Sequence, residues 1–225
     1  MGVRHLRYDD LVTHTVLRPL AALLLLAGSG AAAYEPTPGL AAVADAIRIG
    51  ESRIERTRVQ FHQPYRIRVG RAPVDTIDLV TPFRRLVIAV EQHMLQGARS
   101  FRQQDGQAVL AQHGPTLDVI VGLTFHPHNA YVGVPSYEVV LASGAPQVPV
   151  PPVRIERVPR SGPRVQAGPT SSPYPGPWDG DAMLGGTVIA SFDATRIDQR
   201  ARYDVVVSER GKELARTTVD LASLR

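Results

Sequence analysis

TLDVIVGLTF, residues 116–125, is the clearest strand signal in the chain. Its apolar side chains occupy every second position from Leu117 to Phe125. Because successive side chains of a β-strand point to opposite faces, this alternation predicts a strand with one buried face. Further strands are predicted at 65–69, 76–80, 136–141, 153–158, 187–192, 203–208 and 213–221.

Many short strands separated by turn signals are typical of β-sandwiches and barrels. The sequence therefore predicts a mainly β, antiparallel β-sandwich-like fold with one or two N-terminal helices. We expect residues 126–135 to connect two strands as a long hairpin loop. Residues 209–212, with Gly211, should form a tight hairpin turn.

Two segments show helical spacing of apolar residues. The first runs from Leu40 to about Arg56, although Gly50 inside it disfavours a continuous helix. The second covers 81–97, where Thr81-Pro82 resembles a helix start and Gly97 an end. The apolar run 86–90 would also suit a buried strand, so both possibilities stay open for 81–97, with helix preferred.

The first 33 residues resemble a cleavable signal peptide. A basic stretch with Arg4, Arg7 and Arg18 precedes the apolar run 20–27, and small residues end at Ala33. This order predicts cleavage before Tyr34 and a periplasmic or secreted mature protein. An uncleaved anchor is the alternative, but the apolar run is shorter than the roughly 20 residues of a membrane-spanning helix. We therefore expect no stable membrane span after leader cleavage.

The composition narrows the classes of function. The chain has no cysteine, which excludes thiol catalysis and disulfide scaffolds. Arginines gather between Arg48 and Arg71, but acidic residues interrupt them and only Phe61 and Tyr65 could stack on bases. We expect no nucleic-acid partner and interpret these arginines as a solvated face. The common motifs for nucleophiles, phosphate loops and zinc proteases are absent.

The chain divides by composition into four parts. After the leader, 1–33, we expect a helix plus β-sandwich-like domain at 34–159. A loop rich in proline and glycine follows at 160–181. The C-terminal strands at 182–225 should complete the same domain, and a division into two lobes near 145–185 is the alternative.

Two places in the sequence suggest a binding site. His126 and His128, one residue apart at a strand end, could both bind a metal ion, with a third ligand from His62, His93, His113 or Glu138. Tyr174 and Trp178 could form an aromatic platform for a glycan or peptide. The sequence thus favours an exported, non-enzymatic protein that binds another protein or a cell-surface polymer. A metal-binding protein or metal-dependent enzyme centred on His126 and His128 is the alternative.

Overall fold

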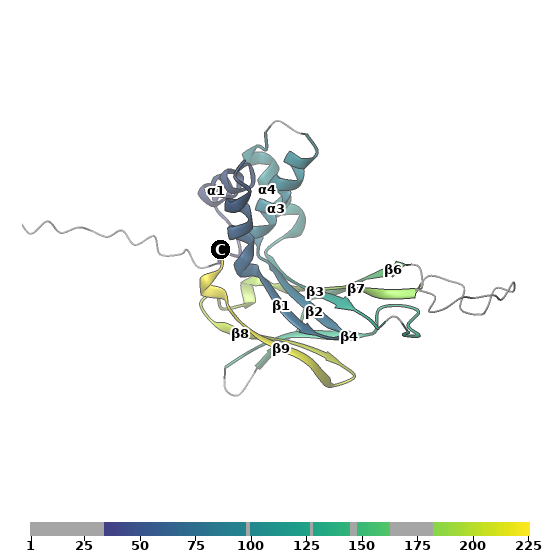
Figure 1. The fold of residues 1–225 in the computed structure, drawn as a ribbon. Helices are drawn as coiled ribbons and strands as arrows, with labels where there is room; N and C mark the ends of the chain where they lie inside the picture. Colours follow the sequence, from purple (N-terminus) through teal and green to yellow (C-terminus); the bar gives the residue numbers. More distant parts are fainter. Residues whose placement is uncertain (1–33, 98–99, 127, 145–147, 163–181) are drawn as a thin grey trace, which may run out of the picture. The chain divides into compact units, whose positions relative to one another are not determined.

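The computed structural model describes residues 34–97, 100–126, 128–144, 148–162 and 182–225 (Figure 1). Within these ranges nine strands form two antiparallel sheets, accompanied by four α-helices. The mainly β, antiparallel prediction is confirmed, whereas the prediction of one or two helices was too low. The proposed leader lies outside the described residues.

The larger sheet has five strands in the order β1, β2, β3, β7, β6. Their bounds are Arg66–Arg71, Val74–Val80, Thr116–Thr124, Ala182–Asp193 and Arg154–Gly162, respectively. The smaller sheet has four strands in the order β5, β4, β8, β9. Their bounds are Val148–Val150, Tyr137–Ser143, Arg202–Glu209 and Lys212–Asp220.

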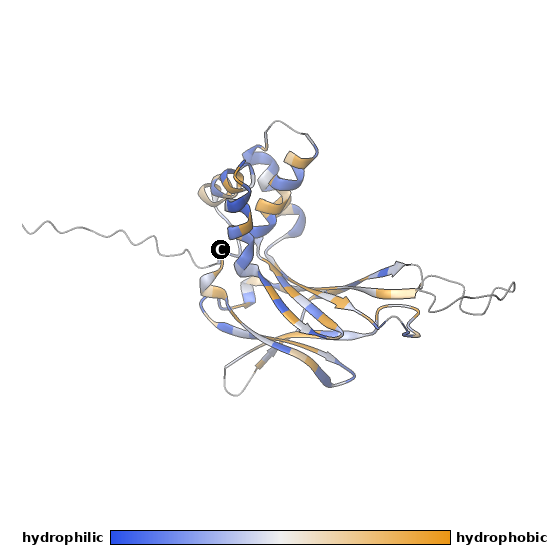
Figure 2. Cartoon of the chain, viewed as in Figure 1, coloured by the Kyte–Doolittle hydropathy of each residue, from blue (hydrophilic) through white to orange (hydrophobic). Residues whose placement is uncertain are grey.

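Both sheets contribute to one buried apolar core. Ile77, Val119 and Val188 come from the five-stranded sheet, and Val139 and Val205 from the four-stranded sheet; all are fully buried in one cluster. Hydrophobic and hydrophilic bands alternate along these strands (Figure 2). Burying a side chain of this size stabilises the fold by roughly 1.5–3 kcal/mol, so the alternating pattern is what holds the sheets together.

The four helices are α1 (Leu40–Gly50), α2 (Glu55–His62), α3 (Pro82–Leu95) and α4 (Gln103–His113). A second apolar cluster joins α1 to α3 through Val43, Ile49 and Leu86, among others. Phe61 of α2 packs against both clusters and so links the helices to the sheets. None of the helices in the described ranges is long and apolar enough to cross a membrane.

The helix prediction for 40–56 was wrong in extent. The segment breaks into α1 and α2, and α1 ends at Gly50. A Cβ at Gly50 would lie 2.6 Å from the Cβ of Val90 in α3. Glycine at the last position of α1 therefore permits the close approach of two helices.

The choice of helix for 81–97 is confirmed by α3. The Thr81 hydroxyl accepts a hydrogen bond from the backbone N–H of Arg84, and Pro82 occupies the first turn. Both features are favourable at a helix N-terminus, where backbone N–H groups lack partners and proline loses nothing. The strand alternative for 86–90 was wrong.

Two connections differ from the expectations. Residues 126–135 do not form a hairpin, because β3 and β4 belong to different sheets. Strand β6 extends to Gly162, so residues 160–162 are strand rather than loop, and β7 begins at Ala182, earlier than 187. The hairpin turn at 209–212 is confirmed: Arg210 and Gly211 both adopt positive φ between β8 and β9.

The C-terminal residue of the chain is fixed at the junction of helices and sheets. The hydroxyls of Tyr65 and Thr81 both donate to the backbone oxygen of Arg225. Its guanidinium binds Asp45 of α1 at 2.7 Å and lies 4.4 Å from the ring centroid of Phe83. The C-terminal segment therefore holds α1, α3 and the start of β1 in one arrangement.

Candidate functional site

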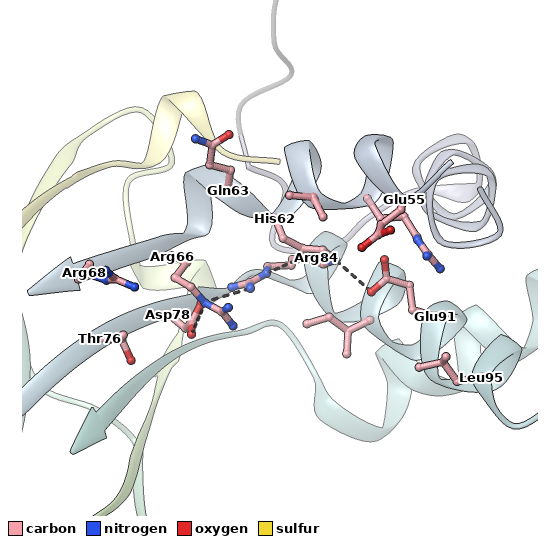
Figure 3. Close-up of a pocket in the computed structure, with 13 residues that line it drawn as sticks. Glu55, His62, Gln63, Arg66, Arg68, Thr76, Asp78, Arg84, Glu91 and Leu95 are labelled. Atoms are coloured by element: carbon pink, nitrogen blue, oxygen red, sulfur yellow. Dashed lines mark hydrogen bonds and ion pairs between the residues drawn. The ribbon is translucent and has the colours of Figure 1, made fainter. Parts of the chain in front are cut away.

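An open cleft of about 1110 Å³ lies where α2 and α3 meet the outer face of β1 and β2 (Figure 3). The two strands form its floor, and the two helices form its wall. The residues that line it are Glu55, Arg58, Val59, His62, Gln63, Arg66, Arg68, Thr76, Asp78, Arg84, Ile88, Glu91 and Leu95. The cleft is thus dominated by charged side chains, with four arginines among them.

Arg84 is the buried centre of the cleft. Its side chain is only 5% exposed, and every part of its guanidinium has a partner. The Nη1 atom donates to the backbone oxygen of Leu79 at 2.6 Å, Nη2 to Asp78 at 3.3 Å and Nε to His62 at 3.2 Å. Burial lowers the pKa of Arg84 and Asp78 opposes this. A guanidinium so engaged organises the site and is not available to a ligand.

His62 is held between Arg84 and Glu91 in one tautomer. Because Arg84 Nε can only donate, Nδ1 of His62 must accept, and the ring proton resides on Nε2. Nε2 then donates to Glu91 at 3.0 Å. Burial is the main cause that lowers the pKa of His62; Glu91 raises this pKa and Arg84 lowers it further. His62 is therefore a neutral ring with both nitrogens committed.

Arg66 and Arg68 stand two residues apart on β1 and point to the same side of the sheet (Figure 3). The Arg66 side chain is 66% exposed, and its Nε donates to both oxygens of Asp78 at 3.2 Å. Arg68 and Arg58 make no hydrogen bond or ion pair to any other described residue. These three guanidinium groups leave most of their donors free to bind an anion.

The helical wall of the cleft is apolar toward solvent. Val59 of α2 is 58% exposed and Leu95 of α3 is 82% exposed, and Ile88 of α3 also lines the cleft. A ligand that fills the cleft therefore meets arginines on the strand side. On the helix side it meets aliphatic side chains together with the charged Glu55, Arg58 and Glu91.

A second arginine–aspartate pair lies beside the cleft. Arg85, the neighbour of Arg84, donates to Asp118 of β3 at 2.7 Å and to the backbone oxygen of Thr116. Its side chain is 8% exposed. The other carboxylate oxygen of Asp118 is buried and has no partner among the described residues. Two consecutive arginines thus attach the N-terminus of α3 to two adjacent strands.

His126 and His128 lie next to each other and are exposed. Their ring centroids are 5.4 Å apart, and the backbone N–H of His128 donates to Nδ1 of His126. Nδ1 of His126 is thus engaged, which leaves its Nε2 as the nitrogen that could bind a metal.

Three of the four donors suggested for a third ligand are engaged elsewhere. His62 binds Glu91, His93 binds the backbone oxygen of Ser100, and Glu138 accepts from Ser208. His113 ends α4. Across the described ranges no three histidines, aspartates or glutamates converge on a point where a metal ion could sit. The metal prediction at His126 and His128 stays a prediction.

The aromatic platform suggested at Tyr174 and Trp178 lies outside the described residues. Exposed valines do occur on edge strands of both sheets: Val148 on β5 is 61% exposed and Val158 on β6 is 44% exposed. Neither lines the cleft.

Sequence reasoning treated the arginines of 48–71 as one solvated face, and the structure divides them. Arg58, Arg66 and Arg68 line the cleft, whereas Arg48 pairs with Asp45 on α1. The spacing of Arg66 and Arg68 on a predicted strand could have shown that they share a face. Nothing local in the sequence indicated that α3 would bring Arg84 and Glu91 to the same place.

No protein-family model, curated protein or solved structure matches the chain.

Proposed function

We propose that the chain is an exported, non-enzymatic binding protein whose cleft takes an anionic group of another protein or of a cell-envelope polymer. The observation that carries this proposal is the contrast inside the cleft. Each nitrogen of the Arg84 guanidinium donates to an internal partner, while Arg58, Arg66 and Arg68 line the cleft with most of their donors unused. Arginine forks of this kind suit carboxylates and phosphates.

The state of His62 supports binding over proton transfer. A general acid or base needs a ring nitrogen within hydrogen-bond reach of its substrate. Both nitrogens of His62 are occupied by Arg84 and Glu91. The size of the cleft also favours a polymer segment, because its volume of about 1110 Å³ exceeds the roughly 300–1,000 Å³ of small-molecule pockets.

Binding of polyanions to purified protein tests the proposal. Polyglutamate and polygalacturonate should both bind at low ionic strength and dissociate as salt is raised, because the arginines are exposed. The Arg66→Glu/Arg68→Glu variant should bind about tenfold or more weakly, the loss expected when about 1.4 kcal/mol of charge complementarity is removed.

Arg56→Glu is the matched control. Arg56 lies on α2 like Arg58 and is exposed, but it does not line the cleft. Equal losses in Arg56→Glu and in the double variant would indicate a general charge effect and contradict a cleft site.

Export is tested separately. The proposal expects the protein recovered outside the cytoplasm to begin at Tyr34, because small residues up to Ala33 suit signal peptidase. Intact-mass measurement of that fraction checks the start. A full-length chain in the membrane fraction would favour an anchor instead.

A further inference from the structure

We propose that the occupant of the cleft is an extended acidic peptide segment that pairs with β1 as an additional strand. This inference rests on the proposed binding function and names the class of partner. Two independent observations carry it: an unpaired sheet edge, and the position of the arginines on that same strand.

The unpaired edge is β1. It ends the five-stranded sheet, and β2 is the one strand of the described residues that pairs with it. Apart from the ladder with β2, no backbone hydrogen bond joins residues 67–71 to any other described segment. The N–H and C=O groups on the outer side of β1 can therefore form a ladder with an added strand, which is a recurring mode of peptide recognition.

The side chains of β1 sort by face. Ile67 and Val69 pack against the buried core of the two sheets. Arg66 and Arg68 point the other way and line the cleft. A strand added beside β1 would place alternate side chains next to Arg66 and Arg68, where opposite charges pair favourably across strands. The preferred segment thus carries acidic residues at every second position.

Arg66 can change partners without leaving Asp78 unpaired. Asp78 accepts from both Arg66 and the buried Arg84. If Arg66 turns to a carboxylate of the incoming segment, Asp78 keeps its ion pair with Arg84. The exposed pair is therefore the exchangeable one, and the buried pair holds the floor of the cleft in place.

The helical wall adds a preference for apolar character. Val59 and Leu95 line the same cleft and are largely exposed. An apolar side chain of the segment that lies beyond Arg66, toward α2, would cover them. Acidic groups beside an aliphatic one describe a peptide better than an anionic polysaccharide, which has no aliphatic side chain to bury.

Charged residues on an edge strand have a second known role, which is to prevent edge pairing. The two roles predict different binding of an acidic peptide, whose charge is opposite to that of the arginines. A protective arginine repels or ignores an added strand whatever its charge, whereas a recognising arginine favours the acidic one. The test uses this difference.

The experiment measures binding of a fluorescent peptide of alternating glutamate and valine, with blocked ends, to the full chain. Two variants of the peptide are N-methylated on the backbone, one at every glutamate and the other at every valine. In a ladder only the N–H groups of alternate residues face β1, so only one of the two variants blocks the pairing. We expect one methylated copy to bind at least tenfold more weakly and the other to bind unchanged. Hydrogen exchange of the amides of 67–71 should slow in the complex.

Charge reversal makes the test specific to the cleft. Arg66→Glu/Arg68→Glu should lose the glutamate peptide and gain the corresponding lysine–valine peptide. Arg56→Glu should behave as the wild type. Arg68→Gln, a milder change at an exposed position, provides the same comparison if the double variant folds poorly.

The outcomes separate the two proposals. Equal binding by both methylated copies would overturn strand pairing and leave the anion-binding function standing. Binding of polygalacturonate without the peptide would overturn the peptide and favour a polymer. If neither anion binds, the proposed function falls together with this inference.

Discussion

Arginines at the N-terminal end of α3 and arginines on β1 are placed in opposite environments. Arg84 and Arg85 are 5% and 8% exposed, and each is paired with an aspartate of the neighbouring sheet. Arg66 is 66% exposed, and Arg68 has no partner among the described residues. Burial separates structural arginines from binding arginines here: a desolvated guanidinium must satisfy its donors internally, while a solvated one can offer them to a ligand.

The sharpest way to break this comparison is Arg85→Met. The change keeps the side-chain volume but leaves the Asp118 carboxylate, already short of one partner, half-buried beside an apolar group. We expect a loss of about 3 kcal/mol in the free energy of unfolding, as for other broken buried ion pairs. Denaturant unfolding with an unchanged m-value checks this.

Adding Asp118→Asn to that variant should recover part of the loss, because an amide costs less to desolvate than a carboxylate. If Arg85→Met alone unfolds within about 0.5 kcal/mol of the wild type, Arg85 behaves like a surface residue and the comparison fails.

A smaller effect concerns the pH dependence of stability and His62, the half-buried ring that accepts a hydrogen bond from Arg84. The pKa of His62 is lowered in the folded protein, mainly by burial, from its ordinary value of 6.5. As the pH falls through 6.5 the unfolded chain therefore binds a proton that the folded chain resists, so stability falls as the pH is lowered below neutral. Chemical unfolding at several pH values measures this decrease.

His62→Gln should flatten that pH dependence, since glutamine can still accept from Arg84 and donate to Glu91 but does not titrate. Part of the slope should remain, because burial also lowers the pKa of His113. His113→Gln is the matched variant, and an unchanged slope in His62→Gln would show that His62 is not the resisting group.

The binding arginines should hardly affect stability. Arg66→Glu and Arg68→Glu are each expected to change the free energy of unfolding by about 1 kcal/mol or less, since exposed ion pairs contribute little. Thermal or chemical unfolding of the two variants measures it. A loss near that of Arg85→Met would mean that β1 needs its arginines for folding. Exposure would then not separate structural arginines from binding arginines.

The smallest expected effect concerns His126 and His128, which are exposed like Arg66. Two imidazoles should hold zinc only weakly without a third ligand. We expect elemental analysis after dialysis to give little zinc in the wild type and in His126→Ala/His128→Ala. Stoichiometric zinc that disappears in the variant would establish the metal site and move the alternative function forward.

The strands were predictable because their burial is one-sided. TLDVIVGLTF at 116–125 shows its buried face directly in the sequence. Helix α4, QQDGQAVLAQH, was missed because it buries little and contains Gly106. The partition of strands between sheets was also missed at β3 and β4: alternation fixes a face, but pairing depends on contacts far apart in the chain.

The candidate site was less predictable than the fold. Its charged side chains come from four elements: α2, β1, β2 and α3. The alternation at 65–69 gave the common face of Arg66 and Arg68, and the register of β1 with β2 places Asp78 opposite Arg66. The helical wall of the cleft, in contrast, requires the position of α3. That position follows from close helix packing at Gly50 and from the two buried ion pairs, which no local pattern announces.

The strand order also dictates when the molecule can fold during synthesis. β7 lies between β3 and β6, and β8 lies between β4 and β9. Neither sheet can close until the ribosome has produced the last fifth of the chain, so the nascent protein must wait with its apolar strand faces uncovered. For a protein that is exported as we propose, this late closure favours passage as an unfolded chain.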